Sequence, residues 1–217
     1  MYLLLCGAGV GFSVQKHHVE KLPEISKPGN HHIIFEIEDS IEGWSEAFRA
    51  LLASYMRDDD PRFKKYYGKT VTFDYTKIRP YGAYISGGFK APGHEGLELS
   101  INKCRALLEK ACSEGNKLRP IHVHDFVMFM ADAVLSGGIR RSATICIFSP
   151  DDEEMLNAKT GEWWIENPQR SRSNNSVMIV RDKITRDQWK KIIQTVKSFG
   201  EPGFIFSDST ELLIIRA

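Results

Sequence analysis

Segments with the hydrophobic period of a helix alternate with short extended segments along the whole chain. Apolar residues recur at helical spacing in four stretches, which are residues 41–56, 97–112, 126–134 and 189–199. Runs that are typical of strands occur at residues 70–75, 143–148 and 176–180. Helices that alternate with buried strands indicate a sheet covered by helices, so the sequence predicts an α/β fold.

Capping residues mark where several of these helices should begin and end. Ser40 and Asp125 precede two of the helical stretches and are expected to be N-caps. Thr185 and Gln188 have the spacing of a capping box at the start of the last helix, and Gly200 should end it. The predicted buried stripe of this last helix is Trp189, Ile192, Ile193, Val196 and Phe199.

The composition excludes several classes of protein. The 217 residues include 29 Lys and Arg against 28 Asp and Glu, with 42% hydrophobic and 26% charged residues. A chain of this size and balance can bury a large core, which argues against disorder and membrane spans. The formal net charge of +1 supplies no field for nucleic acid or an anionic membrane, so any phosphate binding must be local. The first 14 residues lack a basic start, so no signal peptide is expected.

Four scattered cysteines suit neither a zinc site nor a disulfide framework. Cys104 and Cys112 share the apolar face of the 97–112 helix, and Cys146 lies in the middle of a predicted buried strand. We expect these three cysteines, and Cys6, to be small buried residues. This cysteine usage favours the reducing cytoplasm.

Glycines alternate near the start of the chain, from Gly7 to Phe12 (GAGVGF). The dinucleotide-binding fingerprint requires glycine where Phe12 stands, which disfavours that function. Glycines at alternate positions instead let a ligand or another strand approach the backbone closely, and packing alone could also explain them.

His122 and His124 alternate like the first two metal ligands on a strand of a barrel hydrolase. All seven histidines lie at or before position 124, so no later imidazole could complete such a site. Surface or capping roles are therefore favoured over metal binding, and we expect no metal site.

Two basic loops have the chemistry of a nucleotide site. The first, residues 77–90, combines cations with glycines and serines, and arginine matches phosphate oxygens bidentately. The second, residues 167–175, places amide side chains that can read a base edge beside two arginines. Composition alone is also compatible with two solvent-exposed loops that bind no ligand.

Six short motifs follow one another along residues 1–206. They are Gly9-Val10-Gly11-Phe12-Ser13-Val14, Glu42-Gly43-Trp44, Lys77-Ile78-Arg79-Pro80-Tyr81-Gly82-Ala83, Gly138-Ile139-Arg140-Arg141-Ser142-Ala143, Ser173-Asn174-Asn175-Ser176-Val177 and Gly200-Glu201-Pro202-Gly203. In this order they resemble the adenosylcobalamin-dependent (class II) ribonucleoside-triphosphate reductases. The resemblance implies the N-terminal half of a ten-stranded α/β barrel, hence an incomplete barrel here, from an enzyme that reduces ribonucleotides to deoxyribonucleotides for DNA synthesis.

The resemblance also implies where nucleotides bind. The first basic loop would hold a deoxynucleoside triphosphate effector through Lys77, Arg79, Ser86, Gly87 and Lys90. The second would carry the effector's identity to the substrate base through Asn167, Gln169, Arg170, Arg172 and Asn174. The cleft for the nucleoside triphosphate substrate would include Ala8, Gly9 and Gly11. Arg140 and Arg141 could either meet phosphate or pair with acids.

The family's radical chemistry needs adenosylcobalamin and three cysteines, and the resemblance places none of these cysteines in this chain. We therefore expect no catalytic residue here, no activity of the chain alone, and the remaining half of the reductase chain as a partner that makes the main contacts with cobalamin. Residues 15–69 would contain an insertion and residues 207–217 a divergent tail, as in a split, truncated or frame-shifted gene.

Two other functions stay open at this point. A stand-alone nucleotide-binding regulatory module would keep the loops without the cysteines and would be monodisperse without a partner. A metal-dependent hydrolase built on His122 and His124 would contain a stoichiometric ion. Half a barrel, by contrast, leaves strand edges unpaired and should aggregate or assemble with a complementary chain.

Overall fold

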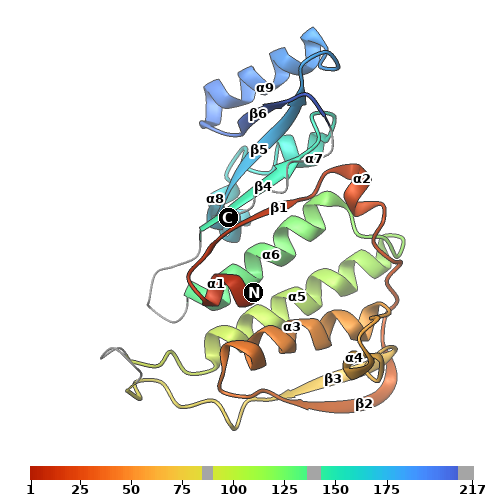
Figure 1. The fold of residues 1–217 in the computed structure, drawn as a ribbon, viewed down its shortest axis with the longest axis vertical. Coiled ribbons are helices and arrows are strands. Elements are labelled where there is room, and N and C mark those ends of the chain that lie inside the picture. Colours follow the sequence, from red (N-terminus) through yellow and green to blue (C-terminus); the bar gives the residue numbers. More distant parts are fainter. Residues whose placement is uncertain (85–89, 136–142, 210–217) are drawn as a thin grey trace. The chain divides into compact units, whose positions relative to one another are not determined.

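The structure is a computed structural model that describes residues 1–84, 90–135 and 143–209 (Figure 1). The chain forms two compact units, neither of which is continuous in sequence. The first comprises Met1–Ala8, Pro23–Leu118 and Phe129–Ser142, and the second comprises Gly9–Leu22, Arg119–Met128 and Ala143–Ala217. Helix α6 (Pro120–Leu135) contributes residues to both units.

The first unit contains a two-stranded parallel sheet and several helices. β2 (Gly29–Glu36) pairs with β3 (Lys69–Asp74), in a register that sets Ile33 beside Val71 and Phe35 beside Phe73. The helices wholly within this unit are α1 (Tyr2–Leu5), α3 (Ile41–Tyr55), α4 (Pro61–Lys64) and α5 (Glu95–Ser113). One face of the sheet packs on a core of Ala50, Ala53, Phe63, Tyr66 and Val71.

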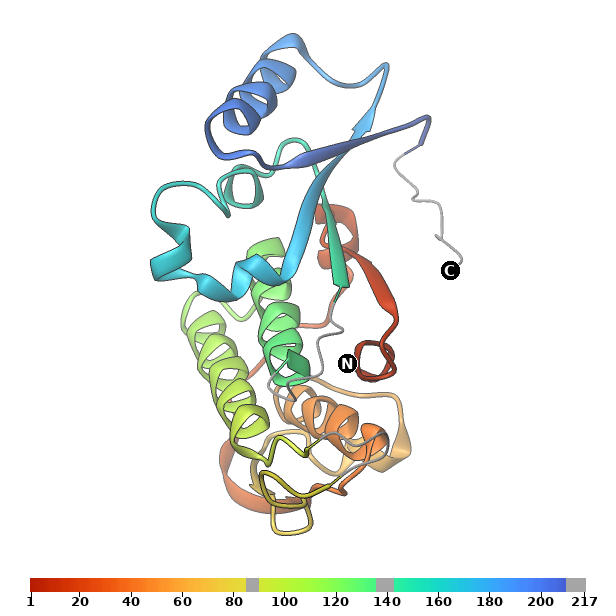
Figure 2. The ribbon, with the colours of Figure 1, turned by 90° about the vertical axis from the view of Figure 1, so that its left-hand side faces the viewer.

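The two long helices of this unit, α3 and α5, lie against each other, as Figures 1 and 2 show. The predicted cap of α3 is confirmed, because the Ser40 side chain accepts a hydrogen bond from the backbone N–H of Gly43 at 2.9 Å. Cys104 is fully buried in α5 as predicted. The predicted burial of Cys112 is wrong, since it is only half-buried although the preceding Ala111 is fully buried.

The second unit is a four-stranded parallel sheet with short helices and one long helix. Its strand order is β1 (Gly9–Ser13), β4 (Ala143–Phe148), β5 (Ser173–Val180) and β6 (Gly203–Ser207). The other elements are α2 (Lys16–Val19), α7 (Glu153–Leu156), α8 (Trp163–Glu166), the 3₁₀ helix η2 (Pro168–Arg172) and α9 (Arg186–Phe199). The predicted α/β class is confirmed.

Helix α9, blue in Figures 1 and 2, begins with the predicted capping box and ends at Gly200, which has φ 77°. Ile192 is fully buried, and the Trp189 ring packs on Phe204 of β6 with 5.2 Å between centroids. The predicted burial of Ile193 and Phe199 is wrong, since they are 39% and 45% exposed. One residue turns a helix by about 100°, so Ile193 faces away from the line of Ile192, and Phe199 lies in the last turn.

Two further expectations are corrected by the structure. Helix α6 begins at Pro120, so Asp125 lies inside the helix and is not its N-cap. Proline is favoured at the first position of a helix, where its missing N–H costs nothing. Cys6 is exposed, because the four-residue α1 that precedes it buries only Leu4. Within the described part of the chain, no helix is both long and apolar enough to span a membrane.

Candidate functional site

The first basic loop begins directly after β3. Lys77 places its Nζ 2.6 Å from Oε1 of Glu38 and 3.0 Å from Oε2 of Glu36, and these hydrogen bonds raise the pKa of the lysine. Arg79 donates from Nε to the carboxylate of Asp39. The three carboxylates lie at the end of β2 and in the turn before α3. Two of the three predicted phosphate-binding cations of this loop, Lys77 and Arg79, are therefore paired with acids.

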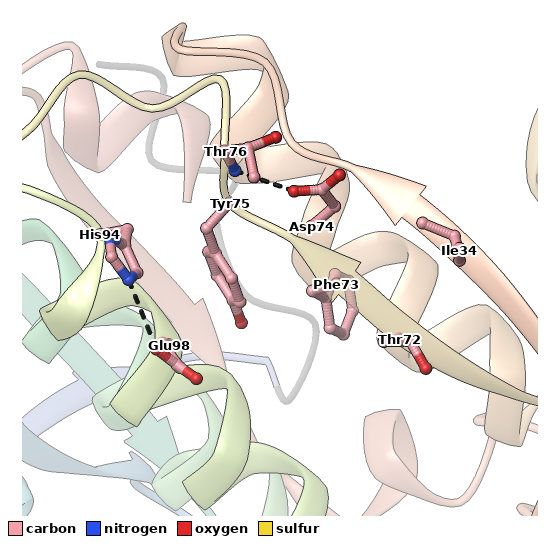
Figure 3. A pocket seen from close by; sticks show the side chains of 8 residues that line it. All are labelled: Ile34, Thr72, Phe73, Asp74, Tyr75, Thr76, His94 and Glu98. Atoms are coloured by element: carbon pink, nitrogen blue, oxygen red, sulfur yellow. Dashed lines mark hydrogen bonds and ion pairs between the residues drawn. The ribbon is translucent and has the colours of Figure 1, made fainter.

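A hollow of ≈ 510 Å³ lies beside this loop (Figure 3). Its lining residues are Ile34, Thr72, Phe73, Asp74, Tyr75, Thr76, His94 and Glu98. Side chains two apart on a strand share a face, so Glu36 lies on the same face of β2 as Ile34. Lys77 directly follows the lining residue Thr76, and its ammonium binds Glu36 on this face of the sheet.

Polar contacts order the rim of the hollow. The Thr76 backbone N–H donates to Oδ1 of Asp74 at 2.9 Å, which lowers the pKa of that carboxyl and holds the turn that presents Lys77. His94 Nε2 lies 3.7 Å from Oε2 of Glu98. The Tyr75 side chain lies between this pair and Asp74, and burial raises the pKa of its hydroxyl (Figure 3). The hollow thus has aromatic and apolar walls with an acidic rim.

A short antiparallel pairing joins the two sides of the first basic loop. Tyr84 and Lys90 form an isolated bridge, and the Gly82 N–H donates to the carbonyl of Ala91 at 2.9 Å. Lys90 is exposed at the base of this loop. The other two predicted effector residues, Ser86 and Gly87, lie outside the described residues, as do Arg140 and Arg141.

The second basic segment is largely ordered secondary structure and not a loop. Residues Pro168–Arg172 form η2, and β5 begins at Ser173, three residues earlier than predicted. Asn167 is half-buried, and Gln169 is buried with its Nε2 3.5 Å from Oδ1 of Asn167. Asn174 on β5 and the Arg172 side chain are exposed.

Arg170 is engaged within the protein. Its guanidinium donates to both carboxylate oxygens of Asp125, at 2.9 Å to Oδ1 and 2.7 Å to Oδ2, and to the carbonyl of Ala158. Burial alone would raise the pKa of Asp125, but hydrogen bonds from His124 and Arg170 outweigh it and leave the pKa below its usual value. Arg170 therefore anchors η2 to the start of α6.

A buried polar network that the sequence analysis missed surrounds this pair. The fully buried His124 contacts Asp125 through Nδ1 and both Ser173 and Asn175 through Nε2, each at 3.1 Å. Lys159 is also buried and donates to the Ser173 carbonyl and, at 2.8 Å, to Glu201. No local pattern reports contacts between residues this far apart in sequence, so only the fold reveals the network.

His122 and His124 do not share one face, and the favoured surface role is wrong for both, because both are buried. Residues 121–125 are helical, and two residues along a helix correspond to a turn of about 200°, so the two rings point apart. His122 contacts Arg119 through Nε2 at 2.9 Å, whereas His124 faces β5. The described residues contain no group of three or more His, Cys, Asp or Glu side chains that could hold a metal ion.

The glycine-rich segment is strand β1 itself, which excludes the dinucleotide-binding arrangement of a strand followed by a glycine turn. Gly11 lies beside Ile145 of β4, and a Cβ at Gly11 would come within 3.3 Å of the Ile145 Cγ2 atom. A side chain at Gly11 would therefore crowd β4, although Gly11 itself is exposed. Gly9 is exposed, and Ala8 lies in the turn after α1, where its N–H donates to the Leu3 carbonyl.

Comparison with known proteins relates this chain to one enzyme group, although no family model matches it. A protein of Dictyostelium discoideum named probable adenosylcobalamin-dependent ribonucleoside-triphosphate reductase is 32% identical over 182 residues, which cover 81% of this chain and 22% of that protein. The enzymes of Lactobacillus gasseri and Lactobacillus leichmannii that carry this name are 26% and 25% identical, over 93% and 94% of this chain. The chain is a homologue of the class II ribonucleotide reductases.

The fold agrees with this homology. A crystal structure of a B12-dependent (class II) ribonucleotide reductase superposes with a TM-score of 0.79 at 22% identity, and the match covers 97% of this chain and 32% of that one. The chain spans between about a fifth and a third of the length of the class II reductases it matches. The resemblance drawn from the six motifs is thereby confirmed.

Proposed function

We propose that this chain supplies the effector-binding loops and part of the substrate cleft of an adenosylcobalamin-dependent reductase that converts ribonucleoside triphosphates to deoxyribonucleotides. The observation that carries the proposal is the match, over 93–94% of the chain, to proteins named for this activity. In this proposal residues 1–206 belong to the catalytic barrel, with an insertion within residues 15–69, and the chain works with the remaining half of the reductase.

The first basic loop is the proposed effector site. Lys77, Arg79 and Lys90 would meet the phosphates of a deoxynucleoside triphosphate, with Ser86 and Gly87 supplying hydroxyl and backbone donors. Charge-assisted hydrogen bonds from such cations to phosphate are shorter and stronger than neutral ones. The hollow beside Lys77, which has aromatic walls and hydrogen-bonding groups, supports this placement.

The second basic segment would transmit the effector's identity in two ways. Asn167, Arg172 and Asn174 would face nucleotide. Gln169 and Arg170 would act indirectly, because the first is buried and the second holds η2 through Asp125. At the proposed substrate cleft, Ala8, Gly9 and Gly11 would let a nucleotide approach the backbone where no bulky side chain intervenes.

Two of the four cysteines, Cys104 and Cys146, are poorly suited to the radical or reducing chemistry of the cobalamin centre. Burial raises the pKa of the Cys104 and Cys146 thiols, and both side chains are fully covered, so neither can act as a radical or reducing cysteine at an open site. In this proposal the main cobalamin contacts lie in other parts of the reductase, and no catalytic residue is assigned to this chain.

Assembly with the rest of the reductase is supported by the sheet of the second unit. No strand among the described residues pairs with the outer edge of β1 or of β6. Phe204 and Phe206 on β6 are 42% and 47% exposed, although parallel sheets are normally covered on both faces. Light scattering of the purified chain should therefore show self-association, whereas a monodisperse monomer would favour the regulatory module.

Calorimetric titration of the purified chain with each of the four deoxynucleoside triphosphates and Mg²⁺ tests the effector site. At least one should bind, and Arg79→Ala should weaken binding at least tenfold, since a hydrogen bond to a charged group contributes about 1.5–3 kcal/mol. Lys110→Ala, on the exposed last turn of α5, is the matched control and should leave affinity unchanged. Absence of binding, or equal affinity in the Arg79 variant, would contradict the proposal.

A further inference from the structure

We propose that Glu36, Glu38 and Asp39 compete with the effector's phosphates for Lys77 and Arg79, and so set the effector concentration at which the loop responds. This inference rests on the proposed effector site and concerns its regulation. Without an effector, the carboxylates hold both cations. A bound triphosphate would take their place.

The contacts of the two cations support this competition. Lys77 donates to two carboxylates, at 2.6 Å to Glu38 and 3.0 Å to Glu36, and Arg79 donates to Asp39. Carboxylate and phosphate oxygens accept from the same N–H groups, so each acid occupies a donor that a phosphate oxygen would otherwise use. A phosphate that engages these two side chains fully must therefore displace the acids from the donors they occupy.

The balance of charge points the same way. Three carboxylates face two cations, so the cluster is net negative, and Asp74 and Glu98 on the rim of the hollow add to this. A triphosphate approaching the closed cluster would be repelled, and only separation of the cations from the acids turns the loop into an anion site. The acids therefore oppose binding both by occupying the donors and by their field.

The backbone that carries the acids is held in place. The fully buried Ile37 lies between Glu36 and Glu38, and its N–H donates to the Asp74 carbonyl at 2.9 Å. Asp39 immediately precedes Ser40, whose side chain caps α3. The cations are the far ends of long, half-exposed side chains, which can change rotamer without moving the backbone.

The exposure of the pairs makes them displaceable. The Lys77 and Arg79 side chains are 46% and 44% exposed, and exposed ion pairs stabilise a protein only slightly. A triphosphate that engages both cations at once can therefore replace them. The acids would lower affinity without abolishing binding, as expected for an element that tunes a threshold.

The test compares effector affinity in variants that lose the same charge at different places. Glu38→Gln combined with Asp39→Asn removes one partner of each cation. Glu42→Gln combined with Glu109→Gln makes the same change in charge on α3 and α5, at residues for which the described structure shows no ion pair to either cation. Each protein is titrated with each deoxynucleoside triphosphate and Mg²⁺, and with inorganic tripolyphosphate as a probe of the phosphate contacts alone.

We expect the first double variant to bind effector and tripolyphosphate about fivefold more tightly, equivalent to about 1 kcal/mol at 1.4 kcal/mol per factor of ten. The control should change less than twofold. Equal or weaker binding by the first variant, with wild-type binding intact, overturns the competition but leaves the effector site standing. Absence of binding in every protein overturns the effector site and the competition with it. Thermal unfolding shows whether each variant is folded. If the double variant is unfolded, Glu38→Gln alone replaces it, and its affinity for the effector should rise about twofold.

Discussion

The carboxylate of Asp125 accepts two hydrogen bonds from the guanidinium of Arg170, at 2.9 Å and 2.7 Å, across 45 residues of sequence. The pair is almost closed to solvent, with side-chain exposures of 11% and 14%. It ties η2, which leads into β5, to the first turns of α6. The shape of the second basic segment therefore depends on an ion pair formed within the protein.

Asp125→Asn should lower the free energy of unfolding by roughly 3 kcal/mol, because removing one partner leaves a buried charge uncompensated. Glu153→Gln breaks the exposed pair with Lys191 and is the matched control. It should cost less than about 1 kcal/mol. Urea denaturation followed by circular dichroism measures both changes, and equal losses would show that burial of the Asp125 pair contributes nothing.

The same pair should make stability depend on pH in acid. The folded-state pKa of Asp125 is lowered relative to the unfolded value of about 3.9. Its contribution is therefore present above that unfolded pKa and is lost as the pH falls through the folded pKa. Melting temperatures of wild type and Asp125→Asn, measured from pH 6 to pH 3, should converge toward the acid end. A gap that stays constant with pH would contradict this account.

Gly43→Ala should destabilise the protein, although Gly43 lies in helix α3. Helix propensity alone predicts a gain of about 1 kcal/mol for this change. A Cβ at Gly43, however, would lie 2.3 Å from the carbonyl oxygen of Glu38, and such overpacking costs about 1–3 kcal/mol. Ser45→Ala, two residues further along the same helix, should be neutral or slightly stabilising. Chemical denaturation distinguishes the two outcomes, and a gain in Gly43→Ala would show that the turn before α3 yields easily.

The four cysteines should separate by reactivity toward a thiol reagent in the native state. Cys6 is exposed and should react first, with the half-buried Cys112 following more slowly. Cys104 and Cys146 are fully buried, and burial raises the pKa of both thiols, so they should react only on unfolding. Mass spectrometry after timed alkylation identifies each site. Early labelling of Cys146 would indicate that the sheet of the second unit opens in solution.

Local sequence signals determined the α/β class, the caps of α3 and α9, and the buried strand β4, since each depends on neighbours within a few residues. The order of six motifs was enough to relate the chain to the class II reductases. Tertiary structure alone decided what the polar side chains contact. Arg170 and Asp125 looked like a nucleotide ligand and a helix cap, yet they bind each other. Lys77 and Arg79 looked like open cations, yet they meet acids from the end of β2 and the turn before α3. Charge pairing depends on distances in space between residues far apart in the chain, and no local pattern encodes those distances.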